Sequence, residues 1–258
     1  MIVIYDLVRF TCMSDRIKKL FDMDVLFKRR ARAKLLGYED FICKLLVNDL
    51  KERLVDINRD FEKRIMIGPF VEHWQNHMRK LDFEQVMDLD NLNLKNNYDF
   101  ILHCLCLHWA NDPLGKLIQL RMSLKPAGLL MGYLFGGNTL NELRVSFSKA
   151  EIELDSSLSL RVAPMMELKS FGNLLVKAGL KNTVVDLISH EIHYSSLSGL
   201  FEDLRRMGET NVMDKRRKTF LTKKAFNLMV ENYKRDFSQL DGKFNVTFDI
   251  FCFTGWKS

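Results

Sequence analysis

Apolar residues recur along this chain with two periods, and each period indicates the structure of its segment. Over residues 14–59 the spacing is helical, with a break expected at Gly37. Three further segments, "RIMIGPF", Phe83–Met87 and Tyr98–Leu107, are short apolar runs that predict strands, and a helix is expected over Val71–Leu81 between the first two. The helical positions of the first segment include Leu35, Phe41, Leu45, Leu46, Leu50 and Leu54.

The middle of the chain continues the alternation of strand and helix. Asp112 and Pro113 form a favourable N-cap and first helical residue, and Leu114, Leu117, Ile118 and Leu124 then share one helical face. That helix should end at the "KPAG" turn, and "LLMGYLF" should form the next strand. Strand, helix, strand, helix and strand in this order predict an α/β fold with a parallel sheet.

After Gly136 the pattern becomes mainly helical between two long strands. Helices are expected around Leu140–Leu154 and over "MELKSFGNLLVKAGL", the second closed near Gly179, and strands over "TVVDLISHEIHY" and "KFNVTFDIFCFTGW". The charged helical stretch 197–237 between these strands predicts an antiparallel sheet edge with a helical cap. We therefore divide the chain into an N-terminal helical region 1–60, an α/β core 61–196, a cap insertion 197–237 and a final core strand 238–258.

Composition narrows the class of protein. With 258 residues and 47% hydrophobic content, the chain can bury a full core. Its five cysteines are scattered and odd in number, a pattern that favours a reducing compartment over a disulfide framework. We therefore expect a cytoplasmic protein without disulfides. The first ten residues lack the features of a signal peptide, and no run reaches the ~20 apolar residues of a membrane span. The net charge of +6 favours acidic partners only mildly.

The stretch "ILHCLCLHW" raises the question of a metal site. In one continuous strand Cys104, Cys106 and His108 would share a face, and residues two apart stand roughly 7 Å from each other, too far to converge on one ion. His73 and His77 are spaced i, i+4 on the expected helix, but no third ligand is indicated. The pair His190 and His193 falls on opposite faces of a strand. We therefore predict no metal site.

Several longer stretches resemble one family. "LFDMDVLFKRRARAK", "RVAPMMELKSFGNLLVKAGL", "DLRRMGETN", "FTGW" and above all "LCLHWANDPLGKLIQLRMSLKPAGLLMGYLFGGNTLNELR" are similar to the methyltransferase-like family of the complex I assembly factor 5 proteins and their bacterial relatives. The resemblance runs from about Leu20 to Trp256. It implies a Rossmann-like class I methyltransferase sheet that binds S-adenosylmethionine.

The resemblance also implies positions for the site. Cofactor binding falls to Gly68 in the glycine-rich turn, to Asp88 or Asp90 as the acid that binds the ribose, and to His108. Trp109, Asn111 and Asp112 would face the substrate. The pocket is then expected between Gly68, Asp88, His108 and the cap. No residue is singled out as catalytic, because methyl transfer depends mainly on positioning.

The sequence departs from the family pattern at the cofactor turn. Where G-x-G-x-G is expected the chain has "GPFVE", so Phe70 and Glu72 replace two glycines that let the backbone approach the cofactor. Only nine residues separate Asp88 from Tyr98. Because these cannot hold the usual helices and strand, about one βα unit of ~20 residues is missing and the sheet should be shortened.

Two functions remain open from the sequence. One is methyl transfer from S-adenosylmethionine, and the other is non-catalytic assembly or scaffolding, in which the chain binds a respiratory-complex subunit or another acidic partner. In the second, basic residues dock the acidic partner through the helical cap, namely Arg144, Arg205, Arg206 and the cluster Lys215–Lys218. The resemblance further implies arginine side-chain modification in the eukaryotic branch. Nucleic-acid binding is disfavoured because the cations of "FKRRARAK" spread around a helix.

Overall fold

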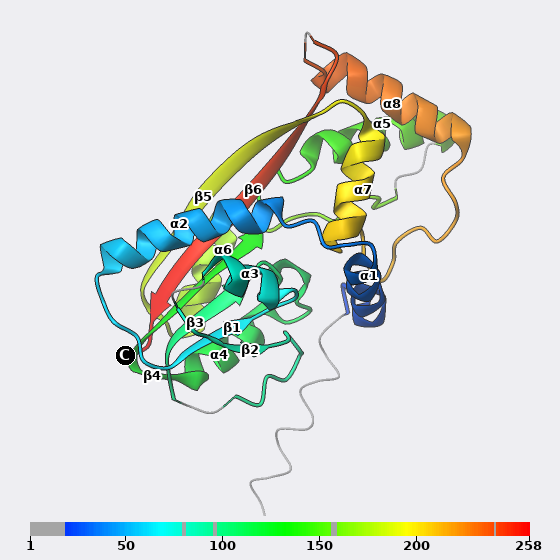
Figure 1. Cartoon of the computed structure of the whole chain (residues 1–258). Helices are drawn as coiled ribbons and strands as arrows, with labels where there is room; N and C mark the ends of the chain where they lie inside the picture. Colours follow the sequence, from blue (N-terminus) through cyan, green and yellow to red (C-terminus); the bar gives the residue numbers. More distant parts are fainter. Residues whose placement is uncertain (1–18, 79–80, 95–96, 156–158, 240) are drawn as a thin grey trace, which may run out of the picture.

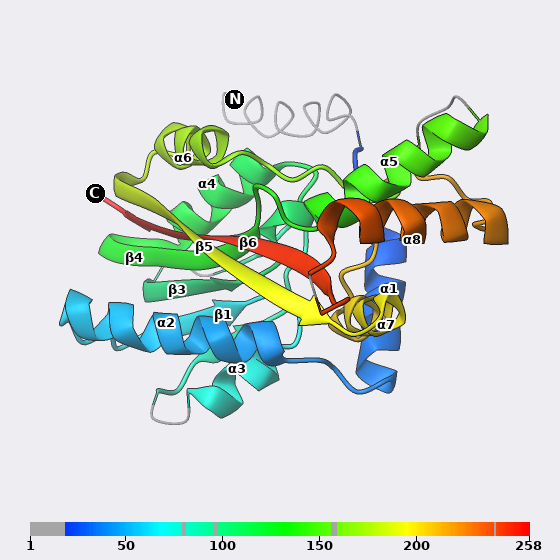
Figure 2. The same ribbon diagram turned by 90° about the horizontal axis from the view of Figure 1, so that it is seen from above.

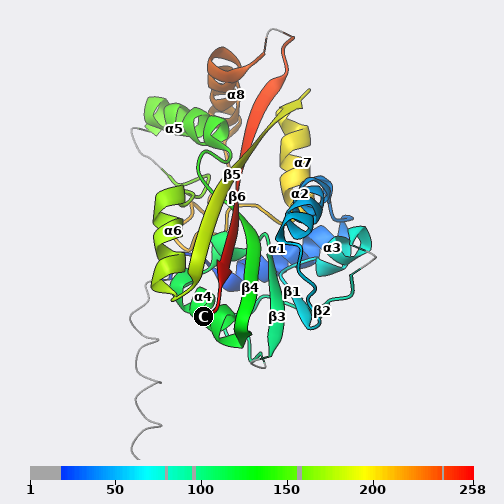
Figure 3. The same cartoon turned by 90° about the vertical axis from the view of Figure 1, so that its left-hand side faces the viewer.

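The protein folds around one mixed sheet of six strands, in the order β2-β1-β3-β4-β6-β5 (Figure 3). The computed structural model describes residues 19–78, 81–94, 97–155, 159–239 and 241–258. The strands are β1 Arg64–Ile67, β2 Glu84–Val86, β3 Tyr98–Cys104, β4 Leu124–Phe135, β5 Lys181–Tyr194 and β6 Phe244–Trp256. Residues 14–18 of the first predicted helix, and Cys12, lie outside the described part.

The first four strands run parallel and the last two complete an antiparallel edge. Ile67 of β1 pairs with Val86 of β2 on one side and with His103 of β3 on the other. β6 pairs antiparallel with both β4 and β5. Beyond β1 at the parallel edge, the described residues contribute only the three-residue β2. The predicted shortened α/β sheet with an antiparallel edge is therefore confirmed.

Helices cover both faces of the sheet. α2 (Phe41–Ile57) and α3 (Val71–His77) lie over one face, and α4 (Pro113–Ser123) and α6 (Leu168–Lys177) lie over the other (Figure 2). Alternation along β3 explains the two cores, because Leu102 packs with the first pair of helices and Ile101 with the second. The long apolar runs read from the sequence are therefore strands buried on both sides.

The remaining helices gather at the carboxyl ends of the parallel strands (Figure 1). They are α1 (Met23–Leu35), α5 (Asn141–Asp155), α7 (Leu197–Met207) and α8 (Lys223–Phe237). α1 contacts α7, and α5 packs against α8. None of the helices among the described residues is long and apolar enough to cross a membrane.

Four predicted boundaries are corrected. The segment expected to be the "KPAG" turn belongs to β4, which begins at Leu124 directly after α4. The helical stretch 197–237 is two helices, because Gly208 ends α7 with a left-handed backbone at φ +76°. The helix expected to reach Leu81 ends at His77, with Met78 as its C-cap. Most important for the site, β3 ends at Cys104. Leu105 turns the chain at φ +47°, and a short 3-10 helix, η2 (Leu107–Trp109), follows.

Candidate functional site

Gly68 lies at the carboxyl end of β1, where the resemblance expects the cofactor turn. A Cβ atom on Gly68 would stand 2.6 Å from the carbonyl oxygen of Cys104 and 2.8 Å from its Cβ. The backbone N–H of Gly68 also donates to the carbonyl of Val86 at 3.1 Å. The glycine is thus needed for the close approach of β1 to β3.

The two other glycine positions carry side chains with contacts of their own. Phe70 caps α3 with a left-handed backbone, φ +54°, which is uncommon for a residue other than glycine. Its ring stacks on Tyr38, with centroids 4.1 Å apart. Glu72 points to Lys34 of α1, 3.6 Å away. The turn that should cradle a cofactor is therefore filled by aromatic packing.

Asp88, the expected ribose acid, lies in a buried polar cluster. Its Oδ1 accepts a hydrogen bond from Lys116 Nζ at 2.8 Å and lies 3.7 Å from His103 Nε2. The Cys106 thiol donates to Oδ2 at 3.3 Å. His103 is fully buried and Lys116 is 5% exposed. Both carboxylate oxygens of Asp88 are therefore engaged within the protein.

The turn at Leu105 explains why this cluster forms. A continuous strand was expected to place Cys106 on the same face as Cys104, which is the face opposite to the neighbouring His103, and that expectation is wrong. With β3 ending at Cys104, the sulfur of Cys106 comes within 3.7 Å of His103 Nε2. Ligand atoms of Asp88, His103 and Cys106 all lie within 4.8 Å of one another, a spacing that suits a metal ion. The ammonium of Lys116 on Asp88, however, already supplies the positive charge.

The electrostatics of the cluster follow from this pairing. Burial alone would raise the pKa of Asp88, but its interactions with His103 and Lys116 hold that pKa well below the usual range. Burial beside Asp88 raises the pKa of the Cys106 thiol well above its ordinary value. Asp88 is therefore ionised at neutral pH, and Cys106 remains a thiol that donates to it.

His108 and Trp109 meet a second buried acid, Glu209. His108 Nε2 lies 2.8 Å from Glu209 Oε2, and the indole of Trp109 donates to the same oxygen at 2.6 Å. Arg30 Nη2 of α1 lies 4.0 Å from the other oxygen. Burial opposes ionisation of Glu209, yet its contacts with His108, Arg30 and Trp109 lower its pKa. This carboxylate joins η2, α1 and the end of α7.

Asn111, Asp112 and Asp90 have local structural contacts. The side-chain oxygen of Asn111 accepts from the backbone N–H groups of Leu20 and Phe21 at 2.8 and 2.9 Å. Asp112 caps α4 by accepting from the N–H of Gly115 at 2.8 Å, as predicted. Asp90 is exposed, and its carbonyl accepts from the Gln119 side chain.

Two small cavities occupy the expected pocket region. One of about 10 Å³ is lined by Asp88, Asp90, Cys106, Trp109 and Lys116, among others. A second of about 150 Å³ lies between Trp109, Glu209 and Phe201 of the cap. The first has room for about one water molecule, whereas pockets for ligands of cofactor size measure roughly 300–1,000 Å³. In this structure the residues beside Asp88 do not fit an adenosyl group.

Sequence reasoning missed four residues of this region: Arg30, His103, Lys116 and Glu209. The sequence contained a signal for Lys116 alone. This lysine lies four residues before Leu120 and seven before Ser123, so all three share the buried face of α4. The other three belong to contacts between segments distant in sequence, such as Trp109 with Glu209. Periodicity carries no information about such pairs.

Comparison with known proteins identifies the relatives of the chain. No model of a known protein family matches it. The chain is 34% identical to the human protein "Arginine-hydroxylase NDUFAF5, mitochondrial", over 95% of this chain and 79% of that protein. It is 30% identical to a malonyl-[acyl-carrier protein] O-methyltransferase of Gallionella capsiferriformans, over 63% of this chain and 53% of the relative.

A solved structure supports the same assignment at the level of fold. A Bacillus halodurans protein named as a methyltransferase superposes with a TM-score of 0.51 at 12% identity, covering 80% of this chain and 97% of that one. The resemblance inferred from the quoted motifs is thereby confirmed. With its methyltransferase-like α/β sheet and its likeness over nearly the whole length, the chain belongs to the family of the arginine-hydroxylase NDUFAF5 proteins.

Proposed function

We propose that this protein is a methyltransferase-like scaffold that no longer binds S-adenosylmethionine and acts by binding a protein partner. The observation that carries this proposal is the state of Asp88. Its carboxylate is bound by Lys116 and Cys106, and the cavity beside it measures about 10 Å³. A cofactor that used Asp88 for its ribose would have to displace a buried ion pair, which is strongly unfavourable.

The partner in this proposal is an acidic protein, a subunit of a respiratory complex, and the cap region supplies the contact. Arg205, Lys215 and Lys218 are exposed there. Others of the predicted basic set are engaged internally: Arg206 pairs with Glu39 at 3.2 Å and Arg216 with Asp22 at 3.3 Å. The proposal therefore rests on Arg205, Lys215 and Lys218.

The proposed compartment is cytoplasmic or another reducing one. Cys43, Cys104, Cys106 and Cys252 are free and buried. The NDUFAF5 relatives are named as mitochondrial, so the compartment of this chain has to be measured by fractionation of its own cells. Blocked or oxidised thiols in freshly isolated protein would contradict a reducing location.

The cofactor part of the proposal is tested by titration. Isothermal calorimetry with S-adenosylhomocysteine and S-adenosylmethionine up to millimolar concentration should give no binding heat, and neither compound should raise the melting temperature. Any binding of free ligand to the folded state would raise it. A saturable isotherm, or density for an adenosyl group beside Gly68 in a co-crystal, would overturn the proposal.

The partner part is tested separately by co-purification of the tagged full chain from its native cells, followed by mass spectrometry. The triple variant Arg205→Glu, Lys215→Glu, Lys218→Glu should lose a respiratory-complex subunit that the wild type retains. The matched control changes three exposed lysines far from the cap, Lys169→Glu, Lys177→Glu and Lys181→Glu. Equal recovery of the subunit by both variants would contradict the proposed surface.

Methyl transfer is the second candidate, favoured by the O-methyltransferase relative and by the fold. It shares the first titration with the scaffold proposal and requires the opposite result. In this candidate the edge beside Asp88 opens when the cofactor binds. Incorporation of a labelled methyl group into any protein of the native lysate, dependent on this chain, would support it.

A further inference from the structure

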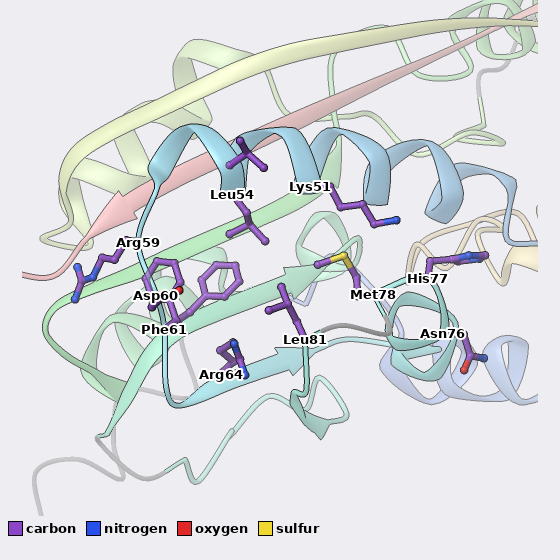
Figure 4. Close-up of a pocket in the computed structure, with 12 residues that line it drawn as sticks. Lys51, Leu54, Arg59, Asp60, Phe61, Arg64, Asn76, His77, Met78 and Leu81 are labelled. Carbon is purple, nitrogen blue, oxygen red and sulfur yellow. The ribbon is translucent and has the colours of Figure 1, made fainter.

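A cavity of about 820 Å³ lies between α2, α3 and the sheet face of β1 and β3 (Figure 4). Arg64, the first residue of β1, lines it, whereas Gly68 follows the last residue of the same strand. Four residues of strand separate these positions by roughly 13 Å. The cavity therefore extends to the amino end of β1, whereas the Asp88 cluster lies at the carboxyl ends of the parallel strands.

The floor of the cavity is formed by apolar side chains that pack against one another. Phe61 and Met78 are 7% and 3% exposed, and Phe100 is fully buried. The rings of Phe61 and Phe100 stack with centroids 5.0 Å apart. On the α2 wall, Val55 remains 75% exposed. Such a surface favours a ligand whose hydrocarbon chain is buried when it binds.

The rim of the cavity is positively charged. Among the described residues that line it, Lys51, Arg59 and Arg64 are cationic and Asp60 is the one carboxylate, so these groups together carry a net charge of +2. Arg59 donates to the carbonyl of Ala127 at 2.6 Å, and Arg64 Nε donates to the carbonyl of Asp82 at 3.0 Å. Both partners are neutral, so neither guanidinium charge is cancelled by these contacts.

The two arginines are also held in position by aromatic rings. The guanidinium carbon of Arg59 stands 5.4 Å from the Phe61 ring centroid and 5.6 Å from that of Trp256. The corresponding distance from Arg64 to Phe83 is 5.8 Å. Cations fixed in this way lose little side-chain freedom when an anion binds, which favours binding.

We propose that this cavity binds an amphipathic carboxylic acid, a molecule with one hydrocarbon chain and an anionic head group. The chain lies along Phe61, Phe100 and Leu54, and the carboxylate meets Arg64 at the rim. A cationic amphiphile is disfavoured by the same charges. This inference is independent of the scaffold function proposed above, because it concerns a different set of residues from the Asp88 cluster and the cap.

The test uses dodecanoate below its micelle concentration, titrated into the full chain by isothermal calorimetry. We expect saturable binding with one molecule per chain. Dodecyltrimethylammonium has the same chain with the opposite charge, and butanoate has the same head group with a short chain, and both should bind at least about tenfold more weakly. Absence of saturable dodecanoate binding, or equal binding of the ammonium compound, overturns the proposal.

Two matched variants locate the site. Val55→Glu places a negative charge in the cavity wall, and Val176→Glu makes the same change at a 61%-exposed position of α6 on the other face. The first should weaken dodecanoate binding at least about tenfold, and the second should leave it within about twofold. Because both positions are exposed, circular dichroism should show both variants folded. Equal dissociation constants for the two variants would place the acid elsewhere and overturn the proposal.

Arg64→Gln sharpens the assignment of the head group. It removes the charge while retaining a hydrogen-bonding side chain at the rim. Dodecanoate affinity should fall about tenfold, and the affinity of an uncharged analogue, dodecanol, should not change. A parallel loss for dodecanol would show that the arginine acts through packing, and the proposed contact with the carboxylate would then be wrong.

Discussion

The two ends of β1 differ in how the shortened sheet is completed. At its carboxyl end, charged and aromatic side chains close the space: Lys116 and His103 approach Asp88, and Phe70 stacks on Tyr38. At its amino end a cavity of about 820 Å³ remains under α2. Both ends border the edge where the chain is about one βα unit shorter than the family pattern.

The difference shows what can compensate for a lost element of a sheet. Buried charges are stable only when they are paired, so the carboxyl end of the strand was filled by groups that neutralise one another. The amino end has an apolar floor and exposed cations such as Lys51, and solvent can remain there. Mutations at the two ends of β1 test whether the carboxyl end is tightly packed and the amino end is open.

The largest effect is expected from Lys116→Met, which removes the buried cation beside Asp88. An unpaired buried carboxylate should lower the free energy of unfolding by about 3–5 kcal/mol, measured by urea denaturation. Lys169→Met, at an exposed site of α6, serves as control and should change it by less than about 0.5 kcal/mol. Adding Asp88→Asn to Lys116→Met should restore part of the loss. If Lys116→Met changed the free energy of unfolding no more than the control does, the packing at the carboxyl end of β1 would not depend on the pair of Lys116 and Asp88.

The second prediction concerns acid. The pKa of Asp88 is lowered in the folded protein, so its stabilising effect is complete above the unfolded value of about 4 and is lost as the pH falls through the lower folded value. The pKa of Glu209 is also lowered, so the stabilising effect of its carboxylate is likewise lost in acid. Stability of the wild type should therefore fall more steeply below about pH 4 than that of Asp88→Asn. Parallel acid-unfolding curves for the two proteins would argue against an ionised Asp88 as the centre of the cluster.

A smaller effect is expected from Gly68→Ala. The new Cβ would meet the Cys104 backbone at 2.6 Å, and this overpacking should destabilise the protein by about 1–3 kcal/mol. Gly172→Ala is the matched control, because its Cβ would find only Val185 at 3.9 Å within the helix α6. It should stabilise by about 0.5–1 kcal/mol. Tolerance of alanine at Gly68 would mean that β1 and β3 do not approach as closely as described.

The smallest effect is expected at the open end. Val55→Ser removes a methyl-bearing side chain that is 75% exposed, so the free energy of unfolding should change by less than about 0.5 kcal/mol. Thermal and urea denaturation measure it, with Val47→Ser, 1% exposed in the same helix, as the contrasting case. A large loss from Val55→Ser would show that the cavity closes in solution.

The sequence by itself determined the order of most helices and strands and the type of sheet. The hydrophobic period and the Asp112–Pro113 helix start predicted the α/β fold and the antiparallel edge, because these depend on local patterns. The missing unit was inferred from the resemblance to the family. The resemblance to the family singled out Gly68 and Asp88 as expected cofactor-binding residues, although the sequence could not test their role.

Only the tertiary structure decided which side chains these residues contact. A single left-handed residue, Leu105, ends β3 early and turns Cys106 toward His103 and Asp88, and no periodicity predicts such a turn. The contact of Trp109 with Glu209 joins segments 100 residues apart. Long-range pairing of buried charges depends on how elements pack, so the closed and open ends of β1 were set by the fold.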